Sequence, residues 1–118
     1  MAAQRALAKD WGFRSFNEAL RSWIATVAIV EVGYVGESEE YVHELGARDY
    51  LEQLARRSPG YGAAHVQEQV APWDERFRAA TVEEAAAHLS PQHGEPGWWQ
   101  HRSPRNWQRP ASEELGLL

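Results

Sequence analysis

The chain has 118 residues, a formal net charge of −5 and no cysteine. This length fits one domain that buries roughly two thirds of the surface of its unfolded chain, so stability requires neither a disulfide nor a structural metal. The absence of cysteine excludes disulfides, thiolate metal sites and thiol nucleophiles.

The N-terminal residues carry Arg5, Lys9 and Asp10 where a signal peptide would have its apolar core. The most apolar stretch, residues 23–35, is too short to span a bilayer. We therefore expect a soluble, cytoplasmic protein that does not contact a membrane.

Charge is unevenly distributed along the chain. Residues 91–110 have a net charge of +2 and the rest of the chain −7. Such an acidic body argues against nucleic-acid binding over the whole surface, although a basic C-terminal segment is still available for it.

The first predicted helix begins at Ser15, because Ser15 and Glu18 have the spacing of a capping box. It is expected to end near Val32, followed by Gly33 as its C-terminal cap. Ile29 and Val32 lie off its apolar stripe, so its second half is apolar almost all round and is predicted to lie at the centre of the fold. A strand is the alternative for these β-branched residues, but the register of the stripe favours a helix. The stripe consists of Phe16, Leu20, Trp23, Ile24, Val27 and Val30.

Residues 38–57 are predicted to form two helices separated by Gly46. Ser38 followed by Glu39 and Glu40 is typical of a helix start, and a short helix is expected from there to Gly46. A second helix runs from 47 to about 57, and the Ser-Pro-Gly sequence of residues 58–60 ends it.

Residues 61–80 carry an apolar stripe that continues through Pro72. Either one helix kinks there or a new helix begins with this proline in its first turn. Thr81 and Glu84 form a second capping-box pattern, which predicts a last helix to about Leu89, with a helix continuous from Trp73 as the alternative. The stripe consists of Val66, Val70, Trp73 and Phe77.

Together these elements predict an all-α fold, an irregular bundle of four or five helices in residues 1–90. Prolines and glycines predict that residues 91–118 form an extended segment packed on the bundle. The predicted core consists of Trp23, Ile24, Val27, Leu45, Leu51, Leu54, Val66, Val70, Trp73 and Phe77.

No sequence motif indicates catalysis, so we predict no catalytic residue, no metal and no cofactor, and the sequence favours a binding protein over an enzyme. Glu40 and His43 have a Glu-x-x-His spacing, but the other ligands of a di-iron bundle are missing. Tyr34, His43 and Arg48 are the candidates for a pocket between helices. Pairing of Arg48 with Glu31 or Glu44 is expected to brace the fold rather than form a site.

The segment from Gly97 to Pro110 contains three of the six tryptophans and three arginines. Trp98 and Trp99 are predicted to complete the core, with interface contact as the alternative. Trp107 is predicted to form an exposed patch, because tryptophan and arginine together are enriched at binding hot spots. The predicted partner-binding residues are thus Trp98, Trp99, Arg102, Arg105, Trp107 and Arg109.

The predicted function is a small protein-interaction or regulatory module, such as an adaptor, an inhibitor or an immunity-type protein. Its partner is expected to be a protein or a second copy of the chain rather than nucleic acid. A small-molecule or metal-binding helical protein is the alternative. Binding of single-stranded nucleic acid by the C-terminal segment is the third hypothesis, with few arginines to support it.

Overall fold

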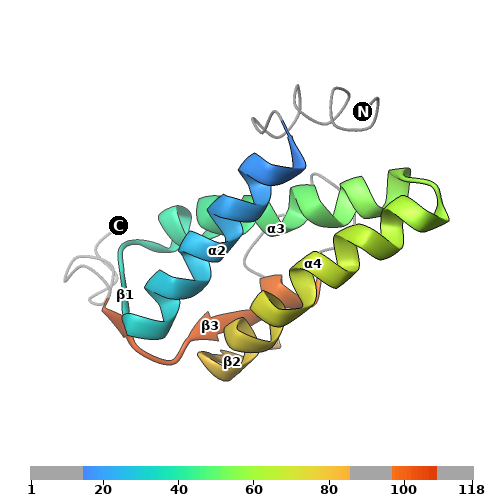
Figure 1. Cartoon of the computed structure of the whole chain (residues 1–118). Coiled ribbons are helices and arrows are strands. Elements are labelled where there is room, and N and C mark those ends of the chain that lie inside the picture. The colour runs from blue at the N-terminus through green and yellow to red at the C-terminus, as the bar shows by residue number, and fades with distance from the viewer. Residues whose placement is uncertain (1–14, 86–96, 109–118) are drawn as a thin grey trace.

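The computed structural model describes residues 15–85 and 97–108, which are mostly helical with a few short strands. The described residues contain three α-helices, fewer than the four or five predicted: α2 (Phe16–Val32), α3 (Ser38–Arg57) and α4 (Gly60–Ala79) (Figure 1). None of these helices has the length and hydrophobicity of a membrane span. The shorter elements are β1 (Tyr34–Val35), β2 (Thr81–Glu83), the 3₁₀ helix η2 (Trp98–His101), β3 (Arg102–Pro104) and β4 (Trp107–Gln108).

Helix α2 begins and ends where the sequence predicts. The Ser15 hydroxyl accepts a hydrogen bond from the Glu18 amide at 3.2 Å, as a capping residue does. The Gly33 amide donates to the Ile29 carbonyl at 2.9 Å, and Gly33 has a φ of 141°, which L-residues rarely adopt. A glycine at this position therefore turns the chain directly into β1.

Helix α3 is one continuous helix, so the predicted break at Gly46 is wrong. Leu45 and Ala47, on either side of the glycine, are both fully buried. A glycine inside a helix costs about 1 kcal/mol, which the burial of its neighbours outweighs. Glu37 occupies the N-cap position without a side-chain hydrogen bond, and the predicted cap Ser38 is the first residue of the helix.

Helix α4 also continues without a break, with Pro72 inside it. The prediction of a helix that begins at Thr81 is wrong, because residues 81–83 form strand β2. The Thr81 hydroxyl donates to the Phe77 carbonyl at 2.8 Å and accepts from Arg102 Nε at 2.7 Å, so it does not cap a following helix. Residues 86–90 of that predicted helix lie outside the described residues.

Within residues 97–108, the described part of the C-terminal segment, two strands pair with the strands that follow α2 and α4 (Figure 1). Strand β3 lies antiparallel to β2, with Thr81 opposite Pro104. Strand β4 lies parallel to β1, with Tyr34 opposite Trp107. These two pairings hold the segment against the C-terminal ends of α2 and α4.

The core lies between the three helices and is completed by η2. All residues of the predicted core are buried except Ile24 and Trp73, which are partly exposed. The core also includes three tyrosines absent from that prediction and the indole of Trp99. These additional residues are Tyr34, Tyr41, Tyr50 and Trp99.

Candidate functional site

A buried ion pair joins Arg48 of α3 to Asp74 of α4. Arg48 Nε donates to Asp74 Oδ1 at 2.9 Å, and Nη2 donates to Oδ2 at 3.0 Å. The indole N–H of Trp23 in α2 donates to the same Asp74 Oδ1 at 3.1 Å. One carboxylate thereby joins all three helices.

The same region of α3 binds the C-terminal segment. The Arg48 guanidinium lies over the Trp99 ring, 4.2 Å from its centroid. The neighbouring Asp49 carboxylate accepts from Trp99 Nε1 at 2.7 Å and from Gln100 Nε2 at 3.0 Å. Arg48 and Asp49 therefore link the helical core to η2.

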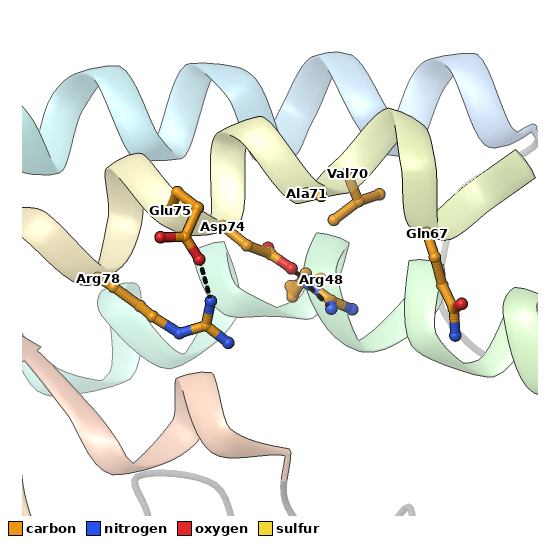
Figure 2. A pocket seen from close by; sticks show the side chains of 7 residues that line it. All are labelled: Arg48, Gln67, Val70, Ala71, Asp74, Glu75 and Arg78. Atoms are coloured by element: carbon orange, nitrogen blue, oxygen red, sulfur yellow. Dashed lines mark hydrogen bonds and ion pairs between the residues drawn. The ribbon is translucent and has the colours of Figure 1, made fainter. Parts of the chain in front are cut away.

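A cleft of about 250 Å³ lies beside this ion pair, between α3 and α4 (Figure 2). A second ion pair, Arg78 to Glu75 at 2.6 Å, lies on its wall, and the Arg78 guanidinium lies 3.9 Å from the centroid of the Trp98 ring. Each guanidinium of the cleft thus has a carboxylate and an indole ring beside it. The lining residues are Arg48, Gln67, Val70, Ala71, Asp74, Glu75 and Arg78.

The residues predicted to share a pocket lie in three different surroundings. Tyr34 is buried, with its ring centroid 5.3 Å from that of Tyr41 and 5.8 Å from that of Trp107. His43 is exposed on α3. Arg48 pairs with Asp74 instead of the predicted Glu31 or Glu44. No group of three or more metal-binding side chains occurs within residues 15–85 and 97–108.

The glutamates expected to pair with Arg48 have other partners. Glu31 Oε2 accepts from Arg76 Nε at 2.9 Å, and this hydrogen bond lowers the pKa of Glu31. Glu44 accepts from the hydroxyl of Thr26 at 3.2 Å. Neither contributes to the cleft.

The three tryptophans of the C-terminal segment all contact the core. Trp99 is buried, and Trp98 is partly buried against Phe77 at 6.0 Å between ring centroids. Trp107, predicted to be exposed, is also partly buried: its indole N–H donates to the Gly36 carbonyl at 2.9 Å. The pairing of β4 with β1 brings Trp107 onto Tyr34 and Tyr41, so the expectation of an exposed Trp107 is wrong.

The described arginines of this segment bond to the end of α4 and to Thr81, just after it. Arg102 donates to the Thr81 hydroxyl at 2.7 Å and to the Thr81 carbonyl at 3.0 Å. The exposed Arg105 donates to the Ala79 carbonyl at 3.1 Å. Cations at this position are favoured by the helix dipole. Arg109 lies outside the described residues.

Helix α2 has an exposed apolar surface at residues that the sequence places in the core, so that prediction is wrong. Ile29 is 46% exposed and Val32 is 83% exposed, although both were predicted to lie at the centre of the fold. Val35, on β1, is 69% exposed. Ala25 and Ala28 are exposed as well, and their spacing places them on the same helix face as Ile29 and Val32. We refer to Ala25, Ala28, Ile29 and Val32 on this helix face, together with Val35 three residues after Val32, as the α2 patch.

Acidic residues lie close in sequence to the end of α2 at which this patch lies. Residues 22–47 contain five glutamates and no lysine or arginine. Glu39 and Glu40 are exposed in the first turn of α3. Glu40 lies next to the end of β1, since a Cβ on Gly36 would be 2.9 Å from its Oε2.

Comparison with known proteins identifies no relative. The chain matches no protein-family model, no curated protein and no solved structure.

Proposed function

We propose that this chain is a small protein-interaction module and that the α2 patch is its contact surface. The observation that carries the proposal is the exposure of Val32 and Val35, 83% and 69%, beside Ile29 on the same segment. Single exposed apolar residues are common on protein surfaces, but clustered ones mark interaction sites. A partner that covers these side chains removes apolar surface from water, which is worth about 25 cal/mol per Å².

The opposite face of α2 makes it a firm support for such a contact. Trp23, Val27 and Val30 are buried beneath the patch. Both ends of the helix are capped, at Ser15 and Gly33. A preorganised surface loses little conformational entropy when a partner binds.

The C-terminal segment borders this surface. The Asn106 side-chain amide donates to the Val32 carbonyl at 3.5 Å, which places the turn between β3 and β4 next to the patch. In this proposal Trp107 supports the surface through its contacts with Tyr34 and Tyr41, and the exposed Arg105 lies at its edge.

Affinity capture from the source cells tests the proposal. Val32→Ser combined with Val35→Ser removes the apolar contact, and the exposure of both residues predicts a stability change within about 0.5 kcal/mol. Tyr61→Ser is the matched control, because Tyr61 is 91% exposed at the start of α4, away from β1 (Figure 1). We expect a protein that the unmodified chain and the control retain and the double variant loses.

The captured protein is then purified and titrated against all three chains. At least tenfold weaker binding to the double variant is expected, and sedimentation measures whether the partner is a second copy. Equal affinity for all three chains would contradict the α2 patch as the contact surface.

A second candidate function, small-molecule binding, is favoured by the cleft beside Arg48. Its paired charges suit a small neutral or zwitterionic polar ligand better than an ion of one sign, because an ion would compete with existing pairs. A thermal-shift screen against amino acids and other zwitterions tests it. A true ligand should raise the melting temperature of the unmodified chain but not that of the Gln67→Ala variant. If no compound does so, the cleft is a structural feature only.

A further inference from the structure

We propose that the segment bound by the α2 patch is basic as well as apolar: a stretch of a partner protein in which lysine or arginine alternates with large apolar side chains. This inference deepens the proposed function and rests on it. It is carried by the charge around the patch.

The local charge is strongly negative. The five glutamates of residues 22–47 occur without any lysine or arginine in the same stretch, and three of them, Glu37, Glu39 and Glu40, follow Val35 within five residues. None of these three forms an ion pair in the part of the chain that the structure describes. Their charge is therefore not compensated by a neighbouring cation within the described residues.

Two described basic side chains close to this region, Arg76 and Arg105, are already bound. Arg76 is paired with Glu31, which also neutralises the glutamate nearest to Val32 in sequence. Arg105 donates to the Ala79 carbonyl on α4. Since both arginines are held by these other acceptors, an incoming cation meets the carboxylates of the α3 first turn without a competitor from the described chain.

Helix stability explains part of this charge and not the whole arrangement. Glu39 and Glu40 are in the first turn of α3, where acidic residues favour the helix dipole. The helix dipole accounts for these two glutamates, but it does not account for the exposed valines next to them. An apolar patch next to carboxylates that no described cation compensates is complementary to a basic, apolar segment and repels an anionic membrane or a nucleic acid.

Selection from a random peptide library identifies the chemistry that the α2 patch prefers. Peptides of about 15 residues, long enough for a helix or strand to cover the patch, are selected on the unmodified chain. Peptides that also bind the Val32→Ser and Val35→Ser double variant are removed. We expect the remaining peptides to combine lysine and arginine with leucine, isoleucine or aromatic residues and to carry a clear positive net charge.

Affinities of the selected peptides then separate the charge from the apolar contact. Glu39→Gln with Glu40→Gln is expected to weaken binding at least fivefold. Glu68→Gln with Glu75→Gln on α4, the same change in net charge, is the control and should weaken it less than twofold. Raising NaCl from about 0.05 M to about 0.5 M is expected to weaken binding roughly tenfold, because surface charges are then screened.

Three outcomes would overturn the inference, and they differ in what they say of the proposed function. Selected peptides that require Val32 and Val35 but are neutral or acidic would refute the basic partner and leave the interaction surface in place. If the two glutamine double variants weaken peptide binding equally, the basic partner is likewise refuted and the interaction surface remains in place. If no peptide depends on the valines, and captured proteins do not either, both proposals fail.

Discussion

The guanidinium of Arg48 and the carboxylate of Asp74 meet in two hydrogen bonds of 2.9 and 3.0 Å within the helical core. The pair is deeply buried, with side-chain exposures of 9% and 11%. Because the Trp23 indole donates to the same carboxylate, the pair fixes the relative positions of α2, α3 and α4.

Removing the acid of this pair should be severe. Asp74→Ala leaves the buried Arg48 with the 3.3 Å contact to Glu52 as its remaining ion pair among the described residues, and loss of one partner of a buried pair costs about 3–5 kcal/mol. Urea denaturation measures the change. Glu75→Gln breaks the exposed pair with Arg78 and should cost less than about 1 kcal/mol. Similar losses for the two variants would show that the buried pair does not brace the helices.

Trp107→Ala should destabilise the protein by about 2 kcal/mol. The change removes the indole hydrogen bond to Gly36 and the ring contacts with Tyr34 and Tyr41. Thermal unfolding measures the loss. Arg105→Ala is the control at an exposed position, and it should leave the melting temperature almost unchanged. An unchanged melting temperature for Trp107→Ala would return this residue to the exposed patch that the sequence suggested.

Gly46→Ala should stabilise the protein by about 0.5–1 kcal/mol, since alanine is the better residue within a helix. The added Cβ has no atom within 4 Å to collide with. Gly33→Ala is the contrasting variant and should destabilise, because φ is 141° and its Cβ would lie 2.9 Å from Asn106 Nδ2. Denaturant titration distinguishes them, and destabilisation by Gly46→Ala would support a helix break there.

Stability should fall as the pH rises above 10. Burial raises the pKa of Tyr34 to about 12 and also raises the pKa of Tyr41 above its usual value. The unfolded chain then loses phenolic protons near pH 10 that the folded chain keeps, so the stabilisation is complete below pH 10 and is lost between pH 10 and 12. Denaturation midpoints across this range measure it. Tyr41→Phe should flatten the decline, although it also removes the hydrogen bond to the Arg102 carbonyl. An identical slope in the variant would contradict the assignment.

Local sequence patterns predicted the parts of the fold in which local forces decide. The capping box at Ser15 and the apolar spacing of α2 and α4 defined both helices, because each turn buries side chains of the same segment. The break at Gly46 was wrong since helix propensity is smaller than the burial of Leu45 and Ala47. Thr81 was misassigned because β3, about twenty residues later, supplies its partner.

The candidate surfaces depended on information that a single sequence lacks. Ile29 and Val32 have the composition of core residues, and only the packing of α2 on one side reveals that they face outward. Arg48 was identified as a brace, but its partner Asp74 is far along the chain and equally plausible glutamates lie nearer. Trp107 is partly covered through the β1–β4 pairing, which joins distant residues.

The dependence of the core on Trp99 has a consequence for synthesis in the cell. The sequence of all three helices has been translated at Ala79. Asp49 and the neighbouring apolar side chains are covered by Trp99, and β1 pairs with the strand that contains Trp107, so both contacts need residues translated later. Until residues 97–108 have left the ribosome, these apolar side chains lack the indole rings that cover them in the finished protein. Exposed apolar surface makes a partly folded chain prone to aggregation, so the last described residues complete the protection of the core.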